Sequence, residues 1–162
     1  MKVFLSKLLE GKHLSEAEAS EALQNLLSSE IPLSQKSSFL ALIQTQGVSL
    51  SEIRGFTSFL REKGTKLNLS EFEAIDVCGT GGDGKNTFNI STATAFVIAG
   101  AGYKVAKHGN VSASSLCGSS DILQFLGVKF TSDESILKKS LEETNFCYLH
   151  APLFQPALKA IA

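Results

Sequence analysis

The sequence predicts an α/β protein in which a small helical N-terminal domain is followed by a domain with a mostly parallel sheet. Apolar residues recur at helical spacing through the first 64 residues, where no convincing strand is found. From residue 74 onward, short apolar runs alternate with helix-like segments, which implies parallel strands joined by helical crossovers. We expect a helical domain over residues 1–66, an α/β domain over residues 67–151 and a further helical segment over residues 152–162.

The helical domain carries two helix-start signals of the same kind. Ser15 with Glu18, and Ser49 with Glu52, match the S-x-x-E capping box. In this motif the serine oxygen accepts a backbone N–H and the glutamate reaches back to the cap. Both stretches therefore predict the start of a helix.

Proline and glycine residues set the other helix boundaries in this domain. The stretch SEIPLS, residues 29–34, supplies a proline break and a further serine cap, and Gly47 and Gly64 stand where helices commonly end in a left-handed residue. Four helices result. Because four helices in about 64 residues make a marginal core, we expect them to dock onto the rest of the chain or onto a second copy.

The elements of the α/β domain follow from its alternating segments. Strands are expected at AIDVC (74–78), YKVAKHG (103–109), GVKFT (127–131) and NFCYLHA (145–151). Helices are expected at 90–102, 119–127 and 133–144, and the final PLFQPALKAIA begins another.

Composition excludes several classes of protein. The chain of 162 residues is 43% hydrophobic and 19% charged, which is ordinary for a soluble globular protein. Its net charge of -1 gives no general attraction to nucleic acid or to anionic membranes, so anion binding must be local. The 3 scattered cysteines favour neither a disulfide framework nor a zinc site, and the first residues are too polar for a signal peptide. We expect a cytoplasmic protein.

The glycine-rich stretch GTGGDGKNTFNIST, residues 79–92, is the first candidate binding loop. It follows a predicted strand and leads into a predicted helix, which is where ligands bind in open α/β sheets. The glycines allow backbone N–H groups to converge on an anion, and the helix start near Ser91 adds its dipole. We infer a phosphate site; the alternative is a tight turn capped by Asp83.

Two common nucleotide motifs do not fit this loop. Asn86 follows Lys85, so there is no Walker G-K-[ST] ending, and the G-x-G-x-x-G pattern with a later acidic residue is absent. ATP and NAD are therefore disfavoured. Asp83 would repel a bare polyanion but suits a ligand with hydroxyls or a metal, so a sugar phosphate fits better.

A second polar stretch, KHGNVSASSLCGSSD at residues 107–121, follows the next predicted strand and should lie beside the first loop. Lys107 supplies a positive charge for phosphate oxygens, Asn110 and the serines offer neutral donors and acceptors, and Ser119 and Ser120 stand near a helix start. Taken singly, a surface lysine, a backbone-bonded His108 and capping serines explain these residues. Two such loops after consecutive strands favour a shared site.

GTGGDGKNTFNIST, followed by KVAKHGN and GSSDILQFLG, closely resembles the anthranilate phosphoribosyltransferases, the tryptophan-biosynthesis branch of the nucleoside phosphorylase-like phosphoribosyltransferases. The resemblance covers the whole chain. It implies transfer of the phosphoribosyl group of phosphoribosyl pyrophosphate, the donor, to the amine of anthranilate, with Mg²⁺ and release of pyrophosphate. It also implies a homodimer formed through the helical domain and no nucleic-acid or membrane partner.

The resemblance also assigns roles to residues. Gly79 would lie between the two substrates, Gly82 and Asp83 would contact the donor, and Ser91 would bind Mg²⁺ as well as pyrophosphate. Asn110 would reach anthranilate and Ser119 the donor. The other implied substrate-binding residues are Thr87, Asn89, Ile90 and Thr92 near the first loop and Lys107, His108, Gly109, Val111, Ser112, Ala113, Ser114 and Ser115 in the second. His108 is a tempting general base, but its loop position has an equal structural explanation, so none is assigned.

Three departures from the family pattern stand out. Val111 replaces the usual arginine, and Ser115-Leu116-Cys117-Gly118-Ser119 replaces a lysine-bearing stretch, so two positive charges are missing. The chain is also about half the family's length, and the resemblance implies that it holds only the first part of the α/β domain, with an exposed sheet edge and a final segment returning towards the helical domain. We expect the 162 residues alone to be inactive.

Two alternatives remain at this stage. A pyrimidine nucleoside phosphorylase would also carry a glycine-rich phosphate loop, but its usual lysine loop is absent. A relative that kept the fold and became a nucleic-acid-binding protein should have a basic surface, against which the net charge of -1 argues.

Overall fold

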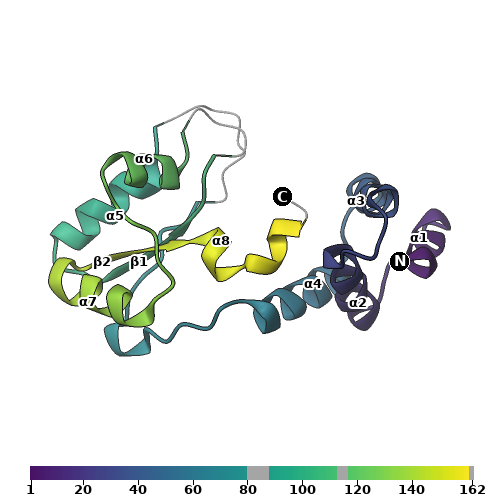
Figure 1. Ribbon diagram of the computed structural model, residues 1–162, viewed down its shortest axis with the longest axis horizontal. Helices are drawn as coiled ribbons and strands as arrows, with labels where there is room; N and C mark the ends of the chain where they lie inside the picture. The colour runs from purple at the N-terminus through teal and green to yellow at the C-terminus, as the bar shows by residue number, and fades with distance from the viewer. Residues whose placement is uncertain (80–87, 113–116, 161–162) are drawn as a thin grey trace. The chain divides into compact units, whose positions relative to one another are not determined.

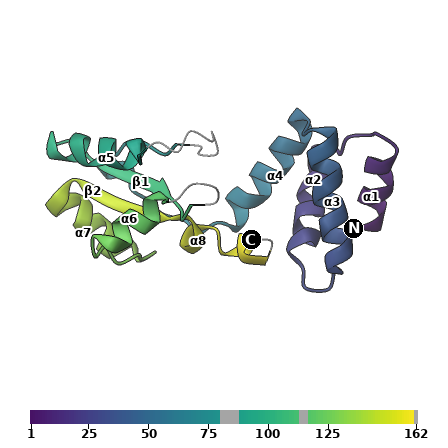
Figure 2. The same ribbon diagram turned by 90° about the horizontal axis from the view of Figure 1, so that it is seen from above.

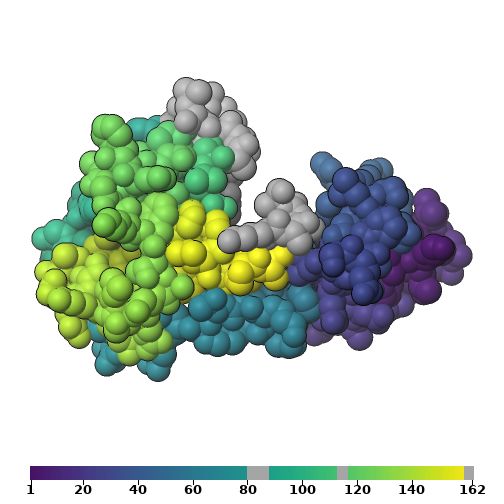
Figure 3. Space-filling view, viewed as in Figure 1, coloured from purple at the N-terminus to yellow at the C-terminus, as the bar shows by residue number. Residues whose placement is uncertain are grey.

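A computed structural model describes residues 1–79, 88–112 and 117–160 of the chain (Figure 1). Contacts divide the chain into two units: the helical unit, Met1–Gly64 with Gln155–Ala162, and the α/β unit, Thr65–Phe154. Residues 155–160 belong to the helical unit: Gln155 Nε2 donates to Leu60 O at 3.3 Å, and these residues (yellow) lie beside α4 (Leu50–Lys63, teal) in Figure 3.

The helical unit contains the four helices expected from the sequence: α1 (Lys2–Leu9), α2 (Glu16–Leu27), α3 (Leu33–Gln46) and α4 (Leu50–Lys63). A short 3-10 helix, η2 (Pro156–Ala160), joins them from the far end of the chain. Apolar residues of all four long helices bury a common core, which is formed by Phe4, Leu8, Leu14, Ala19, Ala22, Leu23, Leu26, Phe39 and Phe59.

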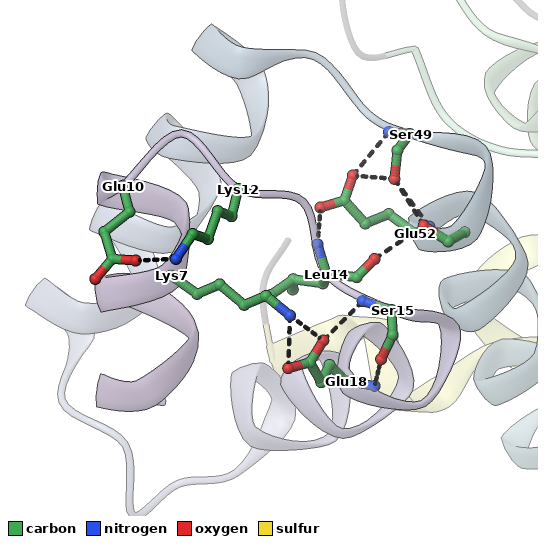
Figure 4. Close-up of polar contacts among 9 residues, drawn as sticks. Lys7, Glu10, Lys12, Leu14, Ser15, Glu18, Ser49 and Glu52 are labelled. Carbon is green, nitrogen blue, oxygen red and sulfur yellow. Dashed lines mark hydrogen bonds and ion pairs between the residues drawn. The ribbon is translucent and has the colours of Figure 1, made fainter.

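Both predicted capping boxes are confirmed (Figure 4). Ser15 Oγ accepts the Glu18 N–H at 3.3 Å while Glu18 Oε2 accepts the Ser15 N–H at 2.8 Å. At α4, Glu52 Oε2 accepts from Ser49 N at 2.7 Å, and Glu52 Oε1 also accepts the Leu14 N–H at 2.9 Å. Glu52 therefore ties the loop before α2 to the start of α4.

Two boundary predictions in this unit are wrong. The predicted serine cap of α3 is absent, since the helix begins at Leu33 with Pro32 at the N-cap and no side-chain cap bond. Proline's fixed φ suits the entry to a helix, so no hydroxyl is needed there. Gly47 has the expected positive φ of 78°, but Gly64 has φ -67° and ψ 150°, so α4 runs directly into extended chain.

The α/β unit has a 3-10 helix, η1 (Ser70–Phe72), and then helices and strands in the order α5 (Ile90–Gly100), β1 (Val105–Gly109), α6 (Ser119–Phe125), α7 (Glu134–Thr144), β2 (Phe146–His150) and α8 (Ala151–Phe154). Strands β1 and β2 pair in parallel with Val105 opposite Phe146 and Gly109 opposite His150. Over the described residues β2 pairs with β1 alone, which leaves its other edge unpaired, as the sequence predicts.

Helices cover both faces of the two strands. Figure 2 shows α5 on one side of the strands and α7 on the other. Because successive residues of a strand point to opposite faces, Val105 packs with Ala95 and Ala99 of α5, whereas Ala106 packs with Leu137 and Leu141 of α7. This sandwich fixes β1, whose carboxyl end carries the second candidate loop.

Two of the four predicted strands are not formed as such. Residues 128–133 have no regular structure, and the Phe130 ring stacks on His150 with centroids 4.5 Å apart. The predicted strand 74–78 reduces to a single parallel bridge between Ile75 and Val105. Apolar character alone does not make a strand, because a strand also needs a neighbour that satisfies its backbone.

Candidate functional site

The carboxyl end of β1 lies next to the first turn of α5 and the start of α6, and several predicted site residues meet there. Thr92 Oγ1 donates to Ser119 Oγ at 3.0 Å, and Asn89 Nδ2 donates to Gly118 O at 3.1 Å. The two hydrogen bonds tie the start of α5 to the start of α6. Ile90, the first residue of α5, is exposed and makes no part of this polar cluster.

Lys107 is the charged centre of this cluster. Its side chain is almost fully buried, with 1% of the residue exposed, and its Nζ donates to Ser91 Oγ at 3.1 Å. Burial lowers the pKa of Lys107 below its usual value, and the negative charges of Cys78 and Asp76 offset this only in part. The ammonium group is therefore not the solvated surface lysine of the alternative interpretation.

The backbone after Lys107 is held closely against the rest of the unit. A Cβ on Gly109 would lie 2.6 Å from the Tyr148 hydroxyl, so only glycine fits at this position. Asn110 O accepts from Ser120 N at 3.1 Å, and Asn110 Oδ1 accepts from Val111 N at 2.8 Å. In this structure the Asn110 side chain is thus engaged in a local turn.

A carboxylate closes the other side of this loop. Asp121 Oδ2 accepts the N–H groups of Ser112 at 3.2 Å and Gly118 at 2.6 Å. The described residues on either side of 113–116 are therefore held by one acceptor in the first turn of α6. Val111, which stands where the family usually has arginine, is half exposed at 50%.

His108 has a structural role through its backbone. Its backbone N–H donates to Asp76 Oδ1 at 3.1 Å, and the same oxygen accepts the Cys78 N–H at 2.9 Å. Sequence reasoning did not single out Asp76. An aspartate that accepts from the N–H two residues on is a common turn signal, and this pattern just before the glycines would have pointed to it.

Part of the predicted site lies outside the described residues. Gly79 is described and exposed, and a Cβ there would come within 4.0 Å of Ser91 Oγ, which places it beside the start of α5. The predicted site residues outside the described ranges are Gly82, Asp83, Thr87, Ala113, Ser114 and Ser115.

The described residues offer little for a metal ion. No group of three or more His, Cys, Asp or Glu side chains within 1–79, 88–112 and 117–160 is arranged to hold one. Ser91 presents one neutral oxygen, which already accepts from Lys107. Since Mg²⁺ requires about six oxygen ligands, these residues fit an ion held mostly by the phosphate oxygens of a ligand and by water.

In the described part of the chain no helix has the length and apolar character to cross a membrane.

Comparison with known proteins identifies two domains in the chain. Residues 2–64 match the helical bundle domain of the glycosyl transferase family, and residues 71–162 match its a/b domain. Among curated relatives, the anthranilate phosphoribosyltransferase of Cytophaga hutchinsonii is 47% identical over 162 residues, covering 100% of this chain and 49% of the relative. That of Bacteroides thetaiotaomicron is 48% identical over 162 residues, with the same coverage of 100% and 49%. The chain spans about half the length of the curated relatives it matches.

Solved structures agree with this assignment. The crystal structure of anthranilate phosphoribosyltransferase from Thermus thermophilus superimposes with a TM-score of 0.81 at 34% identity, over 98% of this chain and 48% of that one. The enzyme from Saccharomyces cerevisiae in complex with PRPP and Mg gives a TM-score of 0.80 at 29% identity, over 99% and 48%. The helical bundle followed by an α/β layer, and the two domain matches in that order, show that the chain belongs to the glycosyl transferase family that combines these domains.

Proposed function

We propose that the chain is the N-terminal half of an anthranilate phosphoribosyltransferase and carries its phosphoribosyl pyrophosphate site. The observation that supports this best is the buried Lys107 ammonium group, which lies within 3.1 Å of Ser91 Oγ at the first turn of α5. A buried positive charge beside a helix N-terminus and several hydroxyls is suited to an anion. The relatives that cover the whole chain carry this enzyme name.

The reaction requires the protein to stabilise charge mainly on the leaving group, pyrophosphate. Breaking the bond between the anomeric carbon and pyrophosphate builds negative charge on pyrophosphate and positive charge on the ribose. Lys107, the hydroxyls of Ser91 and Thr92 and the N-terminal dipole of α5 would stabilise the negative charge, with Ser119 contributing beside Thr92. Because these groups are fixed before the ligand arrives, little reorganisation is needed in the transition state.

The acceptor requires less assistance. The amine of anthranilate is largely unprotonated at neutral pH, so it attacks once it is oriented towards the anomeric carbon. The Asn110 Nδ2 group, in the loop after β1, is the described donor we assign to anthranilate. The proton that the amine loses on bonding to the anomeric carbon can pass to the departing pyrophosphate or to water, so no strong base is required. His108 is assigned no catalytic role; its bond to Asp76 is made by the backbone N–H.

Mg²⁺ is part of the proposal. When bound, it would neutralise charge on pyrophosphate and orient it, and the S. cerevisiae relative was solved with PRPP and Mg. Ser91 is the described residue we assign as its protein ligand. Gly82, Asp83, Thr87 and residues 113–115 complete the proposed donor site.

The remaining parts of the proposal concern the whole protein. We infer a cytoplasmic homodimer formed through the helical unit. We infer no nucleic-acid partner, because the net charge of the chain is -1. Val111 and Leu116 lack the positive charges usual in the family, so donor affinity should be lower than in the relatives.

The proposal is tested by supplying the missing half. The 162-residue chain alone should form no phosphoribosylanthranilate, whereas a fusion of residues 1–162 to the C-terminal half of the B. thetaiotaomicron relative should form it, as followed by the loss of anthranilate fluorescence. A fusion that carries Lys107→Met serves as the inactive control. Product formation by the chain alone would refute its assignment as half an enzyme, and phosphorolysis of thymidine by the fusion would favour a nucleoside phosphorylase.

A further inference from the structure

Building on the proposed function, we propose that Asp76 is a positioning residue of the donor site, whose carboxylate holds together the beginnings of the two proposed substrate-binding loops. Asp76 is not among the residues that the family resemblance assigns. Its Oδ1 atom accepts from the backbone N–H groups of Cys78 and His108, so it would act through the segments that these residues begin.

This proposal is supported by the way in which Asp76 replaces a missing backbone hydrogen bond. Ile75 and Val105 form a parallel bridge, in which Ile75 N donates to Lys104 O and Ala106 N donates to Ile75 O, both at 3.0 Å. Continuing this ladder would pair the His108 N–H with the carbonyl of Val77. That N–H instead donates to Asp76 Oδ1 at 3.1 Å.

Because the Asp76 carboxylate takes the place of the Val77 carbonyl as acceptor, the chain after Asp76 can leave the sheet. The same Oδ1 atom accepts the Cys78 N–H at 2.9 Å, so the turn towards Gly79 and the first loop starts at this carboxylate. One oxygen of Asp76 therefore fixes both the beginning of the first loop and His108, the residue after Lys107, which lies 32 positions beyond Asp76 in the sequence. An aspartate that only formed a local turn would need the Cys78 bond alone.

Two substitutions separate the roles of geometry and charge. Asp76→Asn keeps an oxygen that can accept both N–H groups but removes the charge, whereas Asp76→Ala removes both. Asp133→Asn is the matched control, since Asp133 Oδ1 also accepts two backbone N–H groups, from Ser135 at 2.9 Å and Ile136 at 3.3 Å, at the start of α7.

The first readout uses the 162-residue chain without ligand. Amide hydrogen exchange at Cys78 and His108 should speed up about tenfold or more in Asp76→Ala, as expected for the loss of a charge-assisted hydrogen bond, and stay near the unmodified rate in Asp76→Asn and Asp133→Asn. Unchanged exchange in Asp76→Ala would overturn the proposal. This arm needs no substrate, so it decides the inference even if the proposed function fails.

The second readout uses the active fusion described above. Asp76→Ala should raise the donor KM about tenfold or more with a smaller effect on kcat, whereas Asp76→Asn should raise it about threefold or less at pH 7. Equal donor KM values for Asp76→Ala and Asp76→Asn would overturn the positioning role. An unmodified fusion that binds no donor would instead refute the proposed function.

Discussion

At the scale of single residues, Lys107 shows a conflict between stability and binding. Burial disfavours its charged form, yet a positive charge is what the proposed donor site needs. The hydrogen bond to Ser91 and the nearby acidic groups offset only part of this cost. Natural proteins tolerate such cost mainly where a function requires the group.

Lys107 therefore predicts opposite trends with pH for stability and for donor binding. Because its folded-state pKa lies below that of the unfolded chain, the unfolded state binds more protons between the two pKa values, and stability rises with pH in that window. Donor affinity should fall in the same alkaline window as the ammonium deprotonates. Urea titrations and donor binding measured from pH 7 to 11 check both trends, and Lys107→Met should lose both. A donor affinity that stays constant up to the ordinary lysine pKa would contradict the prediction.

The environment of Glu52 predicts that the helical unit loses stability as the pH falls. Burial, the largest single influence, raises its pKa, but the bonds from Leu14 N, Ser49 and His13 together lower it below the usual value. A depressed pKa means that the stabilisation is complete above the ordinary glutamate pKa and is lost as the pH falls through the folded-state value. Glu52→Gln should cost about 2–3 kcal/mol at pH 7, since an amide NH₂ would face backbone donors.

The control for this prediction is the other capping box. Glu18 pairs with Lys7 Nζ at 2.6 Å and caps α2, but it is more exposed than Glu52, so Glu18→Gln should destabilise less. Unfolding by urea at pH 7 and pH 4 compares the two variants. The acid sensitivity of the unmodified chain should be reduced in Glu52→Gln, and a Glu18→Gln effect equal to it would show that burial of Glu52 is not the deciding factor.

At the scale of elements, the packing of α2 on α4 depends on a glycine. A Cβ on Gly55 would clash with Glu16 O and lie 2.7 Å from Ala19 Cβ. Gly55→Ala should therefore destabilise the helical unit by about 1–3 kcal/mol, because the strain of separating the helices exceeds the gain of up to about 1 kcal/mol in helix propensity. In α5, Gly100 has nothing within 4 Å of such a Cβ, so Gly100→Ala should be neutral or stabilising. Urea midpoints that shift in the same direction for both variants would contradict this view.

The elements predicted correctly are those whose signals are local. The capping boxes at Ser15 and Ser49 involve residues within three positions of each other, and both formed as expected. The wrong predictions needed non-local information. Residues 127–131 have a strand-like composition, but Phe130 stacks on the aromatic side chains of β2 instead of pairing its backbone.

The candidate site was predictable where a general rule of α/β sheets applies, and not where it depends on contacts between distant parts of the sequence. Lys107 and Ser91 follow from the rule that loops after parallel strands share one edge, and the structure joins them. That Lys107 would be buried could not be read from its sequence neighbours. Asp76 was missed because its bond to His108 reaches across 32 positions of sequence.

At the scale of the whole molecule, the two units have separate cores. Among the described residues, the core of the helical unit contains none from the α/β unit, and both tyrosines of the chain, Tyr103 and Tyr148, lie in the α/β unit. Multi-domain chains commonly unfold in more than one step.

Two probes should therefore report different unfolding transitions. Tyrosine fluorescence should follow the α/β unit, whereas far-UV circular dichroism should follow both. Glu52→Gln should shift the dichroism midpoint of the helical unit and leave the fluorescence midpoint unchanged. If both midpoints moved together, the units would unfold cooperatively.

The points at which the chain enters and leaves the α/β unit are neighbours. Thr65 N donates to Phe154 O at 2.8 Å, and Thr65 Oγ1 donates to Leu153 O at 3.1 Å. The helical unit resumes at Gln155, so within residues 1–162 the α/β unit starts and ends at one place. A segment whose two ends are held together can be excised with only a short linker to close the gap, so residues 65–154 could be replaced between Gly64 and Gln155 while the two segments of the helical unit stay joined.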